Sequence, residues 1–450
     1  MQGRKDFQPE LFSTVNLDAL IPANHILRKI DRALDLSFVR ELTADLYCKD
    51  NGRPSIDPEL FLRMIFLAHL CGIPSDRKLC EEVGYNLSYR WFCKLNLQDA
   101  VPDHSSLTRT RDRFGEQVFA GIFERIVKVC IDRKIVKGKS LMTDGSLIKA
   151  NASLDSVKRI GPVEEGGKNR INKIIGSKIS NQTHMSRSDP DATIAGKANQ
   201  PKILAYKVHE SIDRDSRVIV DCHITTGSVH DISKFQSRVE TIVEKFDLPV
   251  KEVIADRGYG SAENLIFLKA KKIRSIIPLY TNRCGQGTSV EPGFKFSLKN
   301  DHYVCPEGKV LHRTKNGEQA SHYVSPAAVC RACPRFETCV GVPQKRQGRG
   351  KVLNRNIHQR VFEWALRRQK TWLFKKTLNE RMWKMEGIFA EGKNQHGLRR
   401  ARYRGRAKVQ IQAYIIASIQ NLKRLAAFIL WLMSEIFKNR NFFETADLKI

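Results

Sequence analysis

The stretch KEVIADRGYG, from Lys251 to Gly260, predicts a short buried strand that ends at an acidic residue. Its apolar run, residues 253–255, has the composition of a strand, and the glycines after the acid stop it. We therefore expect Asp256 at the carboxyl end of a strand, where open α/β sheets place their functional groups. Taken alone, Asp256 could equally cap a helix that begins near Ser261. The rest of the chain decides between these two interpretations.

Length and composition indicate a folded protein with a polyanionic partner. The chain has 450 residues, 41% of them hydrophobic, which is enough for about two or three domains with buried cores. It carries 77 Lys and Arg against 48 Asp and Glu, for a formal net charge of +29. These basic residues are spread through segments that look folded, so nucleic acid is favoured as the partner over a membrane surface or a ribosome-like role.

We expect the protein to be cytoplasmic and associated with the nucleoid, with no membrane partner. The N-terminal residues lack the apolar core of a signal peptide. The longest apolar stretch, Ile411 to Phe437, is interrupted by glutamine, asparagine and basic residues, which predicts an amphipathic helix and not a membrane span. The 11 cysteines are mostly scattered among apolar segments, which indicates reduced thiols and not a disulfide framework.

Residues 1–135 are predicted to form an all-helical domain for DNA binding or assembly. Asp57 followed by Pro58 is a cap-then-proline signal for the start of a helix. Residues 75–95 predict two short helices about Gly84, which fits either a base-reading helix-turn-helix or a structural bundle with a basic face. The basic residues of the next segment are candidate DNA contacts: Arg109, Arg111 and Arg113.

Residues 136–280 are predicted to form the first part of a sheet domain, because the hydrophobic period becomes that of strands. One strand leads to Asp144, and residues 203–226 alternate as two further strands, so a three-strand meander is expected. Between them, residues 154–200 are polar and Gly-rich and are predicted to be a mobile surface insertion. The order β, β, β, α, β, α, β is completed by helix 231–246, the strand before Asp256, helix 261–271 and strand 275–279.

This order, with one acid in the first strand and another after the fourth, is the layout of a ribonuclease-H-like core. Such a core needs a third carboxylate, which a later helix can carry. The chain resembles a bacterial insertion-sequence transposase of the DDE type, in the group whose all-helical N-terminal domain precedes a ribonuclease-H-like catalytic domain. The resemblance implies a mixed fold, α+β with α/β character, with a Cys-containing insertion. It is carried, over about residues 50 to 405, by the segments GRPSIDPELFLRM, VPDHSSLTRTRDRFG, TDGSLIKANAS, SDPDA, YKVHESID, TGSVHD, IADRGYGS and MEGIFAEGKNQHGLRRARYRG.

The resemblance implies that Asp144, Asp256 and Glu386 are the catalytic acids and that they hold two Mg2+ (or Mn2+) ions. Mg2+ prefers oxygen ligands, and two such ions activate the nucleophile and stabilise the departing oxygen of a phosphodiester. Glu391 is a rival for the third position. It lies five residues further on and faces another side of the helix, so Glu386 is favoured.

One position departs from the family pattern. The family often has an arginine four residues before the glutamate, and Met382 stands there instead. Either a neighbour, Arg381 or Lys384, takes over its role or the site is weakened.

The implied function is metal-dependent DNA cleavage at the ends of an insertion element and strand transfer into target DNA. The alternative is a catalytically inactive, sequence-specific DNA-binding protein derived from a transposase. The implied partners are double-stranded DNA, as inverted-repeat ends and as target, and further copies of the chain in a homodimer or larger assembly on DNA.

Residues 281–356 are predicted to be a Cys-rich insertion in the catalytic domain. Its candidate ligands are Cys305, Cys330, Cys333 and Cys339, of which the second and third form a C-x2-C pair. An all-thiolate structural Zn2+ site would let so polar a segment fold. The other spacings are not those of a standard zinc ribbon, so a zinc site and simple reduced thiols both stay open.

Residues 357–440 are predicted to be the helical end of the catalytic domain, with the third acid and a basic run. From Lys393 to Lys408 the chain has seven Lys or Arg and no acid, which favours a phosphate-binding surface beside the active site over a solvated charged face. The candidate DNA-binding residues of this run are Lys393, His396, Arg399, Arg400, Arg402, Arg404 and Arg406.

Four further residues near the predicted strand ends are given structural roles. His209, His223 and His230 are expected to be structural or surface histidines and not ligands. Asp231 is expected to cap the helix that follows it and not to be a fourth metal ligand.

Overall fold

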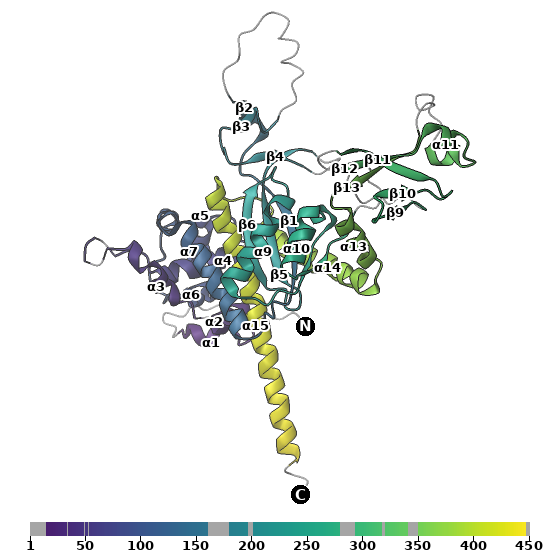
Figure 1. Cartoon of the computed structure of the whole chain (residues 1–450). Helices are drawn as coiled ribbons and strands as arrows, with labels where there is room; N and C mark the ends of the chain where they lie inside the picture. Colours follow the sequence, from purple (N-terminus) through teal and green to yellow (C-terminus); the bar gives the residue numbers. More distant parts are fainter. Residues whose placement is uncertain are drawn as a thin grey trace, which may run out of the picture.

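The chain folds into a helical bundle and a mixed sheet that share one long helix, with a smaller second sheet to one side (Figure 1). The structure is a computed structural model and describes residues 15–33, 35–48, 50–52, 54–160, 180–196, 201–279, 293–316, 320–340 and 350–446. A helical N-terminal region followed by a mixed-sheet region agrees with the fold class predicted from the sequence.

The N-terminal helices pack around α4 (Pro58–Leu70), which is buried along most of its length. This helix begins as predicted, because the Asp57 carboxylate accepts the Glu59 N–H and Pro58 occupies the first turn. The other elements of the bundle are α1 (Leu17–Leu20), α2 (Ile26–Ala33), α3 (Phe38–Thr43), the 3-10 turn η1 (Ala44–Leu46), α5 (Asp76–Tyr85), α6 (Leu87–Phe92) and α7 (His104–Asp132).

The two short helices expected within residues 75–95 are present, but Asn86 and not Gly84 separates them. The Asn86 side chain accepts the backbone N–H groups of Ser88 and Tyr89 and so caps α6. Gly84 lies inside α5, where a glycine is tolerated at a modest cost. The capping residue therefore sets the boundary between the two helices.

The main sheet has the strand order β6–β5–β1–β7–β8, and β4 also pairs with the start of β5. β5 is antiparallel to both β1 and β6, which confirms the predicted meander. β7 is parallel to β1, and β8 is parallel to β7 with α10 as its crossover. The elements are β1 (Ser140–Lys149), β4 (Thr193–Ala195), β5 (Ile203–Asp213), β6 (Ile219–Thr226), α9 (Ile232–Phe246), β7 (Glu252–Ile254), α10 (Ala262–Ala270) and β8 (Arg274–Ile276).

The segment predicted to be a mobile insertion is described in part. Its described residues form the 3-10 turn η2 (Leu154–Ser156), the antiparallel pair β2 (Val157–Arg159) and β3 (His184–Ser186), and β4. Residues 161–179 and 197–200, on which the prediction of mobility mainly rested, lie outside the described residues.

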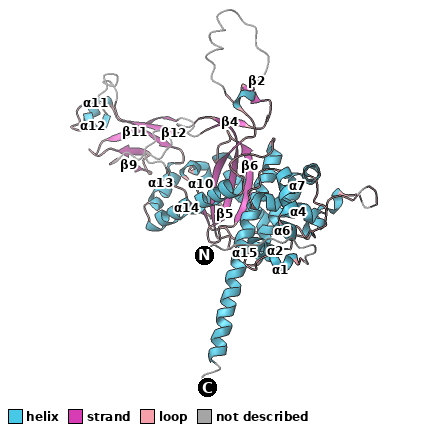
Figure 2. Cartoon of the chain, turned by 180° about the vertical axis from the view of Figure 1, so that it is seen from behind, coloured by secondary structure: helices cyan, strands magenta, loops and turns pink. Residues whose placement is uncertain are grey.

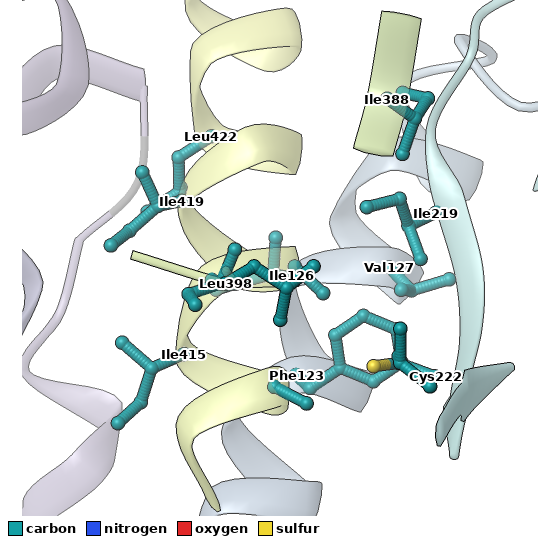
Figure 3. Packing of buried hydrophobic residues seen from close by; sticks show 14 of the residues in the cluster. Phe123, Ile126, Val127, Ile219, Cys222, Ile388, Leu398, Ile415, Ile419 and Leu422 are labelled. Atoms are coloured by element: carbon teal, nitrogen blue, oxygen red, sulfur yellow. The ribbon is translucent and has the colours of Figure 1, made fainter. Parts of the chain in front are cut away.

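The longest helix, α15 (Arg406–Ala446), contacts α7, α4 and α2 of the bundle as well as β6 of the main sheet (Figure 2). Figure 3 shows Phe123 and Ile126 of α7 and Ile219 of β6 packed together with Ile415 and Ile419 of α15. By length and composition the segment Arg406–Glu435 could cross a membrane, but 56% of its apolar window is buried inside the protein. Its burial is that of a core helix.

The polar side chains that interrupt this apolar helix bind the outer edge of β6. Asn421 Oδ1 accepts the Ile219 N–H at 2.8 Å, and Asn421 Nδ2 donates to the Ile219 carbonyl. Gln410 likewise accepts the Ile224 N–H and donates to the Cys222 carbonyl. A strand edge that would otherwise leave backbone groups unpaired is thus satisfied by α15.

The second sheet has five antiparallel strands in the order β13–β12–β11–β10–β9. Its strands and associated helices are β9 (Lys295–Ser297), β10 (His302–Val304), β11 (Val310–Asn316), β12 (Ala320–Val324), α11 (Ala327–Arg331), α12 (Phe336–Val340) and β13 (Val352–Asn356). The chain then returns to the main sheet through α13 (Gln359–Gln369) and α14 (Trp372–Gln395).

Candidate active site

The pairing of β1 with β7 brings two of the predicted acids to neighbouring positions. The two strands are parallel, with Leu141 opposite Val253 and Met142 opposite Ile254. Parallel strands advance in step, so the residues two further along each chain, Asp144 and Asp256, follow the last pair side by side. The apolar residues of β7 are fully buried, and the acid therefore emerges where the strand ends.

The surroundings of Asp144 shift its pKa upwards. Burial is the main cause that raises its pKa, to about 6, and the negative charges of Asp256 and Asp231 raise it further. The Arg381 guanidinium and the Gly145 N–H, which donates to Asp144 Oδ1 at 2.8 Å, oppose this shift. Three carboxylates therefore act on one another at this edge of the sheet.

Arg381 on α14 is the positive group of the site. Its Nη2 lies 2.6 Å from Asp144 Oδ2, and its side chain is 9% exposed. The Nε and Nη2 atoms are buried and have no partner of hydrogen-bond geometry among the described residues. Met382, at the position where the family often has arginine, is 53% exposed. The cation next to the acids is thus supplied one residue earlier than in the family pattern.

Asp256 does not cap the helix that begins near Ser261. Its Oδ1 accepts the Gly258 N–H at 2.7 Å and so caps the 3-10 turn η3 (Arg257–Tyr259). The hydroxyl of Ser261 caps α10 instead, by accepting the Asn264 N–H. Asp256 Oδ1 holds the turn, and its second carboxylate oxygen has no hydrogen-bond partner in the part of the chain that the structure describes.

The two glutamates proposed for the third position have different surroundings. Glu391 forms ion pairs with Lys423 at 2.6 Å and Arg424 at 2.8 Å, and with the His396 ring at 3.5 Å. These groups hold its pKa well below the usual range, although burial acts in the opposite direction. Glu386 is exposed on α14, and among the described residues it has no ion-pair or hydrogen-bond partner. Glu391 therefore ties α14 to α15, and Glu386 is the glutamate left accessible.

Asp231 does not act as the helix cap that the sequence predicts. It precedes α9 with helical φ and ψ, and its side chain makes no capping hydrogen bond. Its carboxylate turns to the sheet, 3.3 Å from Lys207 Nζ and 3.4 Å from His209 Nδ1. A Cβ atom on Gly145 would clash with Asp231 Oδ1. The absence of a side chain at Gly145 lets this fourth acid approach Asp144, which only the three-dimensional structure reveals.

The histidines near these strand ends fit the predicted structural roles. His209 Nε2 lies 2.9 Å from the Thr225 hydroxyl, and burial lowers its pKa to about 4. Burial also lowers the pKa of His223, to about 3. Both rings are therefore neutral at pH 7. His230 accepts the Ser233 hydroxyl and N–H at its backbone carbonyl.

The donor set at this edge suits a hard cation. Asp144 and Asp256 offer carboxylate oxygens, and Asp231 Oδ1 is buried without a hydrogen-bond partner. Within the described ranges, no three His, Cys, Asp or Glu side chains already form a group able to hold a metal ion. The structure therefore brings Asp144 and Asp256 to neighbouring positions at the end of the β1–β7 pairing, whereas Glu386 comes from α14.

Two of the predicted DNA contacts are buried and serve the core instead. His396 is 1% exposed, and its Nδ1 lies 2.9 Å from the His69 carbonyl while His69 Nδ1 lies 3.1 Å from the His396 carbonyl. Arg111 is 2% exposed and pairs with Asp76 at 2.6 Å. The partners that bury both side chains come from distant parts of the sequence, so neither side chain is exposed for a phosphate contact in this structure.

The basic run has counter-charges, although none lies within it. Arg406 pairs with Glu116 at 3.5 Å, and Lys408 pairs with Asp112 at 2.8 Å, both from α7. Arg402 is half-buried, and its burial lowers its pKa. Part of the basic run therefore forms ion pairs with the helical bundle and is not free to bind phosphate.

Other predicted DNA contacts remain at the surface. Lys393 Nζ donates to the Ser146 hydroxyl at 2.6 Å, two residues along β1 from Asp144. The exposed arginines of the run have neutral recorded partners: Arg399 donates to Asn394, while Arg400 and Arg404 donate to Asn151. In the helical bundle, Arg109 contacts the Ser105 and Ser106 hydroxyls, and Arg113 stacks over the Tyr47 ring; both are exposed.

Two family models match the chain. The model of the transposase domain DUF772 covers residues 15–113, which are the helical bundle as far as the first part of α7. The model of a transposase DDE domain covers residues 304–426, from β10 to α15, including Glu386. Asp144 and Asp256 lie between the two matched segments. No curated protein matches the chain.

Solved transposase structures resemble the chain only weakly. A Mos1 transposase paired-end complex with the left transposon end aligns at 10% identity over 51% of this chain and 61% of that chain, with a TM-score of 0.17. A piggyBac transposase synaptic complex with hairpin DNA aligns at 10% identity over 89% and 78%, with a TM-score of 0.31. A Mos1 paired-end complex with Mn aligns at 11% identity over 53% and 65%, with a TM-score of 0.16. These scores are too low to support an argument, and the chain spans less than two thirds of the Mos1 chain in each of the two Mos1 complexes named above.

The family models do not depend on these structural similarities. One transposase model matches residues 15–113, in the helical bundle, and another, a DDE domain, matches residues 304–426, where the chain carries Glu386 and the basic run. Over these two segments the chain is similar to transposases, and over the second to transposases of the DDE type.

Proposed function

We propose that this protein cleaves DNA strands at the ends of an insertion element and joins them to target DNA in a metal-dependent reaction. The observation that carries the proposal is the register of β1 and β7, which sets Asp144 and Asp256 side by side at the end of a buried strand. The position of Arg381 favours the enzyme over a catalytically inactive DNA-binding protein. The departure at Met382 was the one hint of inactivity, and a buried arginine contacts Asp144 in its place.

The strand order supports a ribonuclease-H-like catalytic domain. Three antiparallel strands, β6, β5 and β1, are followed on the other side of β1 by the parallel strands β7 and β8. In this arrangement the first and fourth strands are neighbours, so the acids that follow or interrupt them meet. We propose that Asp144, Asp256 and Glu386 are the catalytic acids, with Asp231 beside them.

Mg2+ or Mn2+, when bound as a pair, neutralises phosphodiester charge and activates a water or a 3′-hydroxyl. In this chain Asp144 and the second oxygen of Asp256 would hold the metal, and Glu386 would complete the set from α14. The Arg381 guanidinium, whose Nε and Nη2 have no hydrogen-bond partner in the described part of the chain, would donate to a phosphate bound beside Asp144.

DNA is the proposed partner, and the exposed cations beside β1 are its proposed binding surface. Arg400 pairs in register with Lys149 at the far end of β1, and Arg399 and Arg404 are exposed nearby in the sequence. Phosphate contacts by such residues would lead the DNA along the strand towards Lys393 and Asp144. A homodimer or larger assembly on paired element ends, in the cytoplasm at the nucleoid, belongs to the same proposal.

The proposal is tested by incubating the purified protein with labelled DNA of the element ends and Mg2+ or Mn2+. Wild type should nick these ends, whereas Asp144→Asn, Asp256→Asn and Glu386→Gln should abolish nicking and leave DNA binding nearly intact. Glu263→Gln is the matched control, since this carboxylate is exposed on α10 close in sequence to Asp256. Nicking by all three variants at the wild-type rate, or its absence from wild type with both metals, would refute the proposal.

A further inference from the structure

The second sheet has too little apolar core to account for its order. Its buried hydrophobic cluster consists of Phe294, Tyr303, Leu311, Tyr323 and Leu353. Small units with so few buried residues usually need a disulfide or a structural metal ion to stay folded. Cys305 and Cys339 pack against this cluster. A disulfide or a metal ion next to these two cysteines would therefore stabilise the second sheet.

The four cysteines of the insertion line one cavity. Cys305 follows β10, Cys330 lies in α11, Cys333 follows that helix, and Cys339 lies in α12. Although up to 34 positions separate them in the sequence, all four contribute to the lining of a cavity of about 30 Å³. A volume of this size is that of a single small ion or molecule. The fold thus gathers thiols that the sequence spacing alone did not connect.

Backbone N–H groups point at two of the sulfur atoms. The Lys309 N–H donates to Cys305 Sγ at 3.3 Å, and the Lys351 N–H donates to Cys330 Sγ at 3.4 Å. The first contact closes a tight turn in which Gly308 has a φ of +75° and Cys305 N–H donates to the Lys309 carbonyl. These two backbone contacts hold the sulfur atoms of Cys305 and Cys330, which both line the cavity.

The charge around the cavity also favours a metal thiolate site. Four thiolates and one Zn2+ have a net charge of about −2. Lys309 and Lys351 both line the cavity. Lys351 Nζ also donates to the Cys339 carbonyl at 2.7 Å, which fixes its position beside the sulfurs. The Lys351 ammonium would therefore offset part of the charge that a four-thiolate site would leave.

We propose that Cys305, Cys330, Cys333 and Cys339 bind one structural Zn2+ ion that links β10 to α11 and α12. Among the described residues no metal-holding group is already assembled, so the proposal requires that the four thiols lining the cavity move closer together when the ion binds. Zinc then takes the tetrahedral four-sulfur arrangement that it prefers. The site is separate from the proposed active site and does not depend on the proposed reaction.

The test measures metal in the purified full-length chain. Elemental analysis and native mass spectrometry should find about one zinc ion per chain in wild type, and less than a tenth of that in Cys330→Ser and Cys333→Ser. Cys80→Ser is the matched control, because Cys80 is also half-buried but lies in the helical bundle. It should keep its zinc. Wild-type protein that is folded, binds DNA and contains no zinc would overturn the proposal, as would unchanged zinc in both insertion variants.

A second measurement separates ligand loss from misfolding. Co2+ exchanged into the wild-type chain should give the visible absorption of a tetrahedral thiolate complex, and iodoacetamide should label the four cysteines only after a chelator has removed the metal. Labelling of the four thiols at the same rate with and without the chelator would contradict the site. A cobalt spectrum without thiolate charge-transfer bands would contradict it as well.

Discussion

The guanidinium of Arg381 lies 2.6 Å from the carboxylate of Asp144, although the two residues are far apart in the chain and belong to α14 and β1. This ion pair is nearly buried on the arginine side, where the exposed fraction is 9%. It joins the helix that carries the proposed third acid to the strand that carries the first. This contact is one of those that hold α14 against the sheet, and it places a positive charge beside the first acid.

Replacement of Arg381 by alanine should reduce cleavage strongly, by about 100-fold or more, because Asp144 loses its counter-charge and a phosphate loses a donor. Met382→Ala is the control, since Met382 is 53% exposed and its loss should leave cleavage within about twofold. Rates on labelled element ends give the comparison. Equal losses in the two variants would show that α14 tolerates no change there and that Arg381 has no special role.

Gly145→Ala should impair the protein through Asp231. The added methyl group would clash with Asp231 Oδ1, at an expected cost of about 1 to 3 kcal/mol in unfolding free energy. Asp231→Ala removes that oxygen, so the double variant should recover much of the loss, with a coupling energy well above the error of about 0.5 kcal/mol. Urea unfolding of the four proteins measures the coupling. If the stability losses of the two single variants simply added in the double variant, the effect of Gly145→Ala would not come from a clash with Asp231.

Local signals predicted much of this fold, because they act over a few residues. The Asp57–Pro58 helix start, the strand that ends at Asp256 and the meander that begins at Asp144 all follow from caps, alternation and glycine punctuation. The register of β1 with β7 does not, since it depends on how α9 returns the chain to the sheet. The adjacency of the two acids was therefore expected from resemblance and is explained only by the structure.

The structure departs from the sequence-based expectations at residues whose partners are remote in the sequence. Arg111 is neutralised by Asp76, and His396 contacts His69, 327 positions away. The basic run lacks acids of its own but faces two from α7. Asp231 precedes a helix, as a cap does, yet its carboxylate turns to the sheet. Sequence spacing reports local geometry, whereas the partner of a charged side chain is decided by tertiary contacts.

Glu391→Gln should destabilise the protein and Glu386→Gln should not. Glu391 loses its pairing with Lys423 and Arg424, at a cost of about 2 to 4 kcal/mol, because breaking a largely buried ion pair leaves its partners uncompensated. Glu386 is exposed, and among the described residues it has no ion-pair or hydrogen-bond partner. Its replacement should therefore change the free energy of unfolding by less than about 0.5 kcal/mol. Urea unfolding at pH 7 measures both. A larger loss of stability in Glu386→Gln than in Glu391→Gln would contradict the structural role given to Glu391.

The Glu391 carboxylate also predicts how the stability of the protein depends on pH. The folded-state pKa of Glu391 lies below its ordinary value of 4.5, so its contribution to stability is present above about pH 4.5 and is lost as the pH falls towards the folded-state value. The stability difference between wild type and Glu391→Gln should therefore shrink as the pH is lowered from 6 to 3. A difference that stays constant over this range would show that the ion pairs contribute nothing.

Exposed arginines of the basic run should carry phosphate contacts. The triple variant Arg399→Ala, Arg400→Ala, Arg404→Ala should bind element-end DNA more weakly, and the slope of log affinity against log salt should fall in magnitude by about 2 to 3. Arg125→Ala with Lys128→Ala is the control, since both side chains are exposed on α7. Fluorescence anisotropy between 50 and 200 mM salt measures the slopes. An unchanged slope in the triple variant would remove these arginines from the DNA interface.

The central claim is that Asp144 and Asp256 hold a metal ion between two neighbouring strands, and iron-directed backbone cleavage tests it most directly. Fe2+ in place of Mg2+, with ascorbate and peroxide, cuts the chain close to the metal, and mass spectrometry locates the cuts. We predict cuts near both residue 144 and residue 256 in wild type, with both lost together in Asp144→Asn and in Asp256→Asn. A cut near residue 386 would add Glu386 to the set. Cuts at one strand only, or cuts at both that persist in either variant, would contradict the account.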